Sequence, residues 1–229
     1  MKDYGYFFKF IRKIGQIILP RYDTTELIDH SDGVSHIVYV SHHQNMYGVI
    51  RIMIWLSERI PLRLWAFSSF FSPEETYDQF VNFTLTERFG LPKWLAKIVA
   101  WPASYVVSKL ANSARCIPVY RKSRKILKTF KETVTALEDD WKALVFPDVD
   151  YASSDTEVDD IYEGFLHLEK LSVRETGKHV KFVPILASKK KRKIHQAQPI
   201  MFDPDVDFMT QRSEIAKEIR NSLNELAEK

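Results

Sequence analysis

The sequence predicts an α/β fold, with a largely parallel sheet flanked by helices, an aromatic-rich helical insertion and an N-terminal amphipathic helix. Short β-branched runs alternate along the chain with longer segments whose apolar residues recur at helical spacing. The 229 residues are 45% hydrophobic, which is enough for a substantial core. Only 7 residues are Gly, and there is no low-complexity run or repeat of fixed period, which excludes a solenoid or a disordered chain. We therefore expect a single domain, residues 1–229.

The first expected element is a basic amphipathic helix within residues 1–20. Phe7, Phe10 and Ile14 fall on one helical face, and Lys9 and Arg12 fall on the opposite face. A helix of this kind either covers the core of its own domain or lies on a lipid surface.

Strands and helices then alternate along the chain. The expected strands are residues 36–41, 115–121, 143–146, 180–188 and one within 194–202, and the expected helices are residues 49–56, 122–141, about 161–171 and the tail from 210. In such a sheet, ligands bind at the carboxyl ends of the strands.

Residues 62–110 interrupt this alternation with a long segment rich in Phe and Trp. Pro73, Pro92 and Pro102 are expected to divide it into several short helices. Ordinary connections are about 4 to 6 residues long, so this segment is expected to be an insertion or a lid over an apolar site.

The cysteine and histidine content limits the chemistry. Cys116 is the only cysteine, so the sequence predicts no intrachain disulfide and a reducing compartment. No run approaches the roughly 20 apolar residues that cross a bilayer, and no membrane span is expected. Apart from the adjacent pair His42 and His43, the histidines lack the spacing of metal ligands, and we expect no bound metal ion.

Two adjacent histidines, His42 and His43, follow the apolar run at residues 36–41 and precede an apolar helix. The N-terminus of a helix disfavours imidazolium, so a histidine there stays neutral and is able to accept a proton. This is what a general base requires. The alternative is that one or both histidines are hydrogen-bonded structural residues.

A series of short blocks places the histidines in a wider pattern. The blocks, in order, are HHQNMYG, CIPVYR, LVFPDVDY, YEGF, VKFVPILAS and QPIMF, between residues 36 and 203. Their order and spacing resemble the glycerol-3-phosphate and lysophospholipid acyltransferase family (1-acylglycerol-3-phosphate acyltransferase-like), with a degenerate HxxxxD motif.

The resemblance implies roles for individual residues. His43 stands at the catalytic base, and Arg121 stands at the arginine that contacts the phosphate of the acceptor; a surface cation that ends a strand is the alternative reading of Arg121. Asp148 takes the place of the family's Glu in the third block. His42, Phe146, Pro147 and Asp150 complete the expected substrate-binding set.

The chain departs from the family at three positions. Gly48 stands where the family has the Asp that orients the histidine, and Val149 and Tyr151 replace a glycine and an arginine of the third block. Without an acid, a histidine base loses orders of magnitude in rate. We therefore expect Asp148 or a neighbouring acid, Asp150 or Asp155, to substitute for the missing Asp.

The resemblance implies an enzyme that moves a fatty acyl group to a hydroxyl of a lysophospholipid or glycerolipid-like acceptor. The donor would be acyl-CoA, an acyl carrier protein thioester or an acyl phosphate, used as a co-substrate without any cofactor. A catalytically silent, lipid-binding homologue is the alternative. The basic first helix and KKKRK at 189–193 predict peripheral binding to an anionic membrane surface, on the cytoplasmic face of the cell membrane. KKKRK lacks interleaved aromatics, so nucleic acid is not an expected partner.

Overall fold

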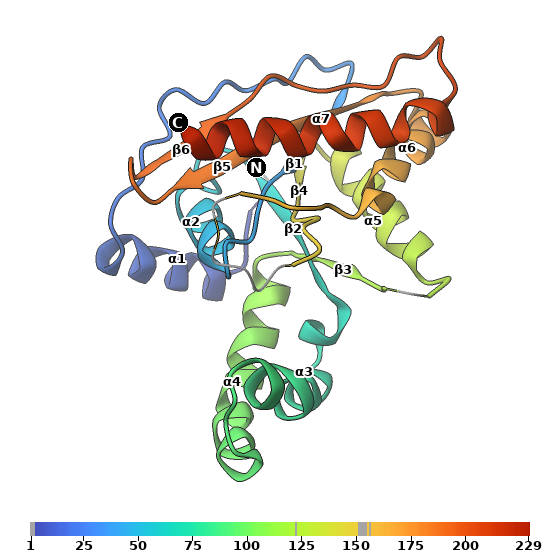
Figure 1. Cartoon of the computed structure of the whole chain (residues 1–229). Helices are drawn as coiled ribbons and strands as arrows, with labels where there is room; N and C mark the ends of the chain where they lie inside the picture. Colours follow the sequence, from blue (N-terminus) through green and yellow to red (C-terminus); the bar gives the residue numbers. More distant parts are fainter. Residues whose placement is uncertain (1–2, 122, 151–154, 156) are drawn as a thin grey trace. The chain divides into compact units, whose positions relative to one another are not determined.

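The computed structural model describes residues 3–121, 123–150, 155 and 157–229, and its elements are shown in Figure 1. The chain divides into two compact units. Unit 1 contains residues 1–11 and 64–129, and unit 2 contains residues 12–63 and 130–229. Two helices, α1 (Tyr6–Ile18) and α5 (Ile126–Glu138), contribute residues to both units.

Among the described residues, no helix combines the length and the apolar character needed to cross a membrane.

The core of unit 2 is built on four strands, β1 (His36–Val40), β4 (Lys142–Val145), β5 (Val180–Ser188) and β6 (Lys193–Gln196). β1 pairs in parallel with β4 on one side and with β5 on the other, and β6 pairs antiparallel with β5. All five residues of β1 are buried. A strand that is buried throughout is expected where parallel strands are covered on both faces, which explains its continuous apolar sequence.

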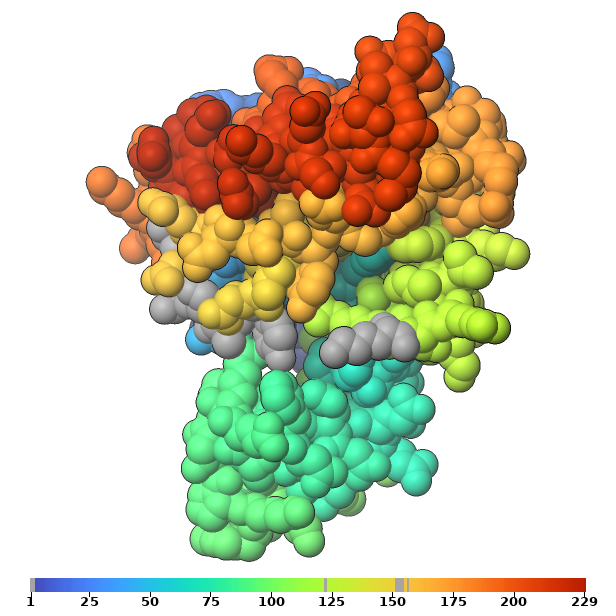
Figure 2. Space-filling view, turned by 45° about the vertical axis from the view of Figure 1, so that its right-hand side comes forward, coloured from blue at the N-terminus to red at the C-terminus, as the bar shows by residue number. Residues whose placement is uncertain are grey.

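Three α-helices lie wholly within unit 2, α2 (Tyr47–Trp55), α6 (Leu168–Thr176) and α7 (Phe208–Glu228), and the 3-10 helix η3 (Glu163–His167) precedes α6. α7 packs against β5 through an apolar stripe formed by Ile215, Ile219, Leu223 and Leu226. Figure 2 shows α7 lying along the segment near residue 160. The Asn224 side chain fastens that segment, because its Oδ1 accepts a hydrogen bond of 2.7 Å from the Val158 backbone N–H.

Unit 1 combines a short parallel strand pair with helices. β2 (Leu62–Phe67) pairs with β3 (Ile117–Val119), with Trp65 opposite Ile117. Between the two strands come the 3-10 helix η1 (Ser68–Phe71), α3 (Pro73–Gln79), the π-helix η2 (Phe80–Arg88) and α4 (Lys93–Ser113). η1, α3 and η2 all pack against α4, which is therefore the organising helix of this unit.

The predicted α/β class is confirmed, since helices alternate with strands whose pairings are mostly parallel. The strand at 180–188 has its predicted bounds. Two expectations for residues 62–110 are wrong. Residues 62–67 form a strand, and α4 is one 21-residue helix that continues through Pro102. Pro102 lies on an exposed side of α4, so the Ile98 carbonyl that loses its N–H partner is open to water.

Candidate functional site

The register of two neighbouring strands brings a histidine and a carboxylate together in unit 2. Val40, the last residue of β1, lies opposite Val145, the last residue of β4. His43 follows Val40 by three residues, and Asp148 follows Val145 by three residues. Because the strands are parallel, both side chains emerge at the same carboxyl edge, where α/β proteins place their sites.

His43 and Asp148 are in direct contact. The Nδ1 atom of His43 lies 2.9 Å from both carboxylate oxygens of Asp148, and the His43 backbone N–H also donates to Oδ1 at 3.3 Å. The Asp148 side chain is 2% exposed, whereas that of His43 is 18% exposed. A carboxylate accepts only, so Nδ1–H donates to Asp148 and the lone pair of the neutral ring is on Nε2. The contact fixes both the tautomer and the orientation of the ring.

Neighbouring residues of both strand ends enclose this pair. The ring of Phe146 lies 4.8 Å from the His43 ring, centroid to centroid, and is buried. The Pro147 carbonyl accepts a 2.8 Å hydrogen bond from the Tyr162 backbone N–H, which holds the segment before Asp148 in place. His42 is 2% exposed, and its Nε2 lies 3.9 Å from Asp148 Oδ2. His42 therefore faces the carboxylate from inside the protein.

Gly48 has a steric reason to be glycine. It lies in the first turn of α2, and its N–H donates a 3.0 Å hydrogen bond to the His43 carbonyl. A Cβ atom at this position would be 2.2 Å from the His42 carbonyl oxygen, which is far inside van der Waals contact. This backbone therefore has no room for a larger side chain at position 48. The carboxylate in contact with the His43 ring is that of Asp148, three residues after β4.

The loop between His43 and α2 is strained. Gln44, Asn45 and Met46 have φ angles of 48°, 50° and 70°, and such left-handed conformations cost roughly 1–2 kcal/mol per residue when the residue has a Cβ. Gln44 is 1% exposed, and neither polar atom of its side chain has a hydrogen-bond partner among the described residues. The Ser41 hydroxyl is in the same situation. Strain and unpaired buried polar groups concentrate at functional sites.

Ser41 and Gln44 were not among the residues predicted from the sequence. The available signal is the polar run SHHQN directly after the run IVYV of β1, where a turn would otherwise carry glycine or proline.

The other predicted site residues are placed as follows. Asp150 and Asp155 are exposed residues of unit 2, beyond Asp148. Arg121 is an exposed residue of unit 1, two positions after β3. Val149 is 40% exposed. Tyr151 lies outside the described residues.

Two surface hollows of unit 2 lie elsewhere. One has a volume of about 330 Å³ and is lined by residues 21–25 and Arg192, and the other has a volume of about 210 Å³ and is lined mainly by residues 26–30 and 193–198. Neither is lined by His43 or Asp148. The His43 side chain is the accessible part of the pair. In the described part of the chain, no cluster of three or more His, Cys, Asp or Glu side chains is arranged to hold a metal ion.

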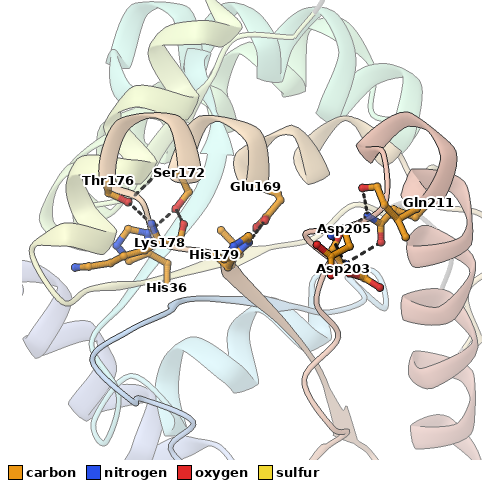
Figure 3. A network of polar contacts seen from close by, with 11 residues as sticks. His36, Glu169, Ser172, Thr176, Lys178, His179, Asp203, Asp205 and Gln211 are labelled. Atoms are coloured by element: carbon orange, nitrogen blue, oxygen red, sulfur yellow. Dashed lines mark hydrogen bonds and ion pairs between the residues drawn. The ribbon is translucent and has the colours of Figure 1, made fainter.

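A second histidine–carboxylate group lies at the amino ends of β1 and β5. His36 Nε2 lies 2.8 Å from Glu138 Oε1, and its Nδ1 lies 2.8 Å from the Ser172 hydroxyl, which is also 2.6 Å from the Lys178 carbonyl oxygen. Figure 3 shows His36, Ser172 and Lys178 side by side. Burial lowers the pKa of His36, and this effect outweighs the opposing hydrogen bond to Glu138.

His179 and Glu169 extend this group. His179 Nδ1 lies 2.6 Å from Glu169 Oε1, and the other oxygen of Glu169 accepts a 2.8 Å hydrogen bond from the Val180 backbone N–H. The Glu169 side chain is buried, and α6 thereby fixes the start of β5 (Figure 3).

The comparisons with known proteins identify no relative: no family model, no curated protein and no solved structure matches the chain.

Proposed function

We propose that the protein is an acyltransferase that moves a fatty acyl group from a carrier thioester or acyl phosphate to a hydroxyl of a lysophospholipid or glycerolipid-like acceptor. The observation that carries this proposal is the pair formed by His43 and the buried Asp148 at the carboxyl edge of β1 and β4. A histidine held at Nδ1 by a buried carboxylate is the arrangement that activates hydroxyl nucleophiles in acyl transfer.

The proposed reaction begins with proton removal. Nε2 of His43 takes the proton of the acceptor hydroxyl as its oxygen attacks the acyl carbonyl carbon. The negative charge of Asp148 stabilises the imidazolium that forms. When the tetrahedral intermediate collapses, the C–S bond of a thioester donor breaks, and the imidazolium returns its proton to the departing thiolate. Histidine ends the cycle neutral, and no cofactor takes part.

The remaining residues have supporting roles in this proposal. Phe146 and Pro147 shape the wall beside the His43 ring, and His42 stabilises the position of Asp148 from the buried side. Asp150 is retained as an acceptor-binding residue at the exposed end of the third block. The assignment of Arg121 to the acceptor phosphate rests on the resemblance alone. Attachment to the cytoplasmic face of an anionic membrane is part of the same proposal.

A catalytically silent lipid-binding homologue is the second candidate. The family's glycine and arginine are replaced at Val149 and Tyr151. This difference favours binding without turnover.

One assay separates the two candidates. The purified protein is incubated with acyl-CoA, acyl carrier protein thioester or acyl phosphate and a panel of lysophospholipids. His43→Ala is assayed beside it, with the control His30→Ala, which changes a histidine outside the blocks. The proposal expects acyl transfer by the wild type and the control and its loss in His43→Ala. Equal turnover in all three removes the proposed mechanism. An absence of turnover with every donor and acceptor favours the silent homologue.

A further inference from the structure

The burial pattern of α4 is the reverse of that of an ordinary amphipathic helix. Its buried positions all carry small side chains, namely Ala96, Ala100, Ser104, Ser108 and Ala111. Four of its large apolar side chains point outward: Trp94 is 66% exposed, Ile98 is 62%, Trp101 is 66% and Tyr105 is 58%. Small residues allow α3, η1 and η2 to approach α4 closely, and the packing of unit 1 makes little use of these four side chains.

These four exposed residues form one stripe, which we call the α4 face. Trp94, Ile98, Trp101 and Tyr105 are separated by four, three and four positions, which places them on one side of a helix over about 16 Å. The rings of Trp101 and Tyr105 contact each other edge to face, with centroids 6.0 Å apart. A contiguous exposed apolar patch marks an interaction surface in most soluble proteins.

The charges of α4 select the kind of partner. The helix contains Lys93, Lys97 and Lys109, all exposed, and neither Asp nor Glu in 21 residues. Two copies of this face brought together would oppose lysine to lysine, which disfavours a symmetric dimer. An anionic lipid surface complements the lysines, and tryptophan and tyrosine are the side chains enriched at the boundary between headgroups and acyl chains.

We propose that the α4 face is a membrane-docking surface, on which Trp94, Ile98, Trp101 and Tyr105 enter the interfacial layer of a bilayer that contains anionic lipid. This inference rests on the membrane attachment in the proposed function and adds a specific helix face to it. It is measured without any acyl donor, so its failure is distinguishable from a failure of acyl transfer.

The test is binding of the full-length chain to phosphatidylcholine vesicles with and without phosphatidylglycerol. We expect binding to the anionic vesicles, and a decrease of about tenfold or more in the partition coefficient of the double variant Trp94→Ser/Trp101→Ser. The matched control is Ile28→Ser/Val34→Ser, which removes two side chains of similar exposure, 59% and 71%, from unit 2, and it should bind as the wild type does. Unchanged far-ultraviolet circular dichroism confirms that each variant is folded.

Two further measurements complete the test. Brominated phosphatidylcholine mixed into the anionic vesicles should quench part of the tryptophan emission of the wild type, and this quenching should disappear in Trp94→Ser/Trp101→Ser. Lys93→Glu/Lys97→Glu should reduce the preference for anionic vesicles. Equal vesicle binding by the wild type and Trp94→Ser/Trp101→Ser overturns the inference. So does a wild-type dimer in sedimentation velocity that the same double variant converts to monomer, because the face is then an interface between copies.

Discussion

The two ends of β1 carry histidine–carboxylate pairs that differ in what they leave accessible. At the amino end, His36 is bonded through one ring nitrogen to Glu138 and through the other to Ser172, and its side chain is 4% exposed. Beyond the carboxyl end, His43 is bonded through Nδ1 to Asp148, and its side chain is 18% exposed. A histidine–carboxylate contact is therefore not by itself a functional site.

The two pairs differ in the strand end at which they lie and in how deeply the histidine is buried. The His36 group connects β1 to α5 and α6 and orders the amino edge of the sheet, so its contribution is to stability. The His43 pair follows the carboxyl edge, beside a strained loop and unpaired buried polar groups. We therefore expect that changes at the two ends affect different measurements.

The largest expected effect is that of Asp148→Asn on acyl transfer. The amide has nearly the shape of the carboxylate but no charge, so it neither holds the useful tautomer nor stabilises the imidazolium. We expect the rate constant of acyl transfer to fall by about a thousand- to ten-thousand-fold, measured under donor and acceptor saturation. Asp139→Asn makes the same substitution at an exposed position and serves as the control. A decrease of less than tenfold in the rate constant of Asp148→Asn would show that Asp148 does not assist His43 in the proposed reaction.

The next effect is that of Gly48→Ala on stability at the carboxyl end. The added Cβ would lie 2.2 Å from the His42 carbonyl oxygen, so the loop must shift. We expect the free energy of unfolding to fall by about 1–3 kcal/mol in urea denaturation, despite the better helix propensity of alanine. Gly164→Ala is the matched control, because nothing lies within 4 Å of its Cβ position, and it should be neutral or stabilising by up to about 1 kcal/mol. Equal stabilities of the two variants would mean that the backbone at Gly48 is not constrained.

The smallest expected effect is on the pH dependence of the free energy of unfolding, and it arises from His36 at the amino end of β1. The pKa of His36 is lowered from 6.5 in the folded protein because burial disfavours the charged ring, so the unfolded chain binds more protons as the pH falls below about 6.5. The contribution of His36 to the free energy of unfolding is therefore fully present above about pH 6.5 and decreases as the pH falls below that value. His36→Gln, which does not titrate, should lose less stability between pH 7 and pH 5 in parallel urea titrations. The pKa values of His30, His167 and His195 are also lowered, so the wild type and His36→Gln share a background decrease in the free energy of unfolding over this pH range. The same slope in both proteins would show that His36 does not contribute to the pH dependence.

Much of the sheet could be predicted from the sequence, because its central strands are short, apolar and β-branched. The strand at 180–188 and the strand that begins at His36 were predicted in this way. The partnership of His43 with Asp148 was predicted only as one of three possible acids. The choice among them depends on which residues of β1 and β4 lie opposite each other, and 105 residues separate the two side chains in the chain.

The sequence was less informative where packing overrides local pattern. Residues 62–67 lie in an aromatic-rich stretch that was interpreted as helical, although they pair with β3 as a strand. The outward orientation of the large residues of α4 was not predicted, because apolar spacing indicates a helical face but not what covers it. The steric reason for Gly48 depends on how closely a carbonyl approaches, which only the folded backbone determines.

Val40 of β1 lies opposite Val145 of β4, and this pairing determines whether His43 and Asp148 meet. When a base and an acid lie on the same helix turn, they stay close to each other even if the surrounding sheet is disrupted. Here they meet only when two interior strands have paired, and sliding one strand by a single residue would turn its side chains to the opposite face. The His43–Asp148 contact and the pairing of β1 with β4 therefore form together, so a form of unit 2 in which these strands have separated lacks the contact on which the proposed function depends.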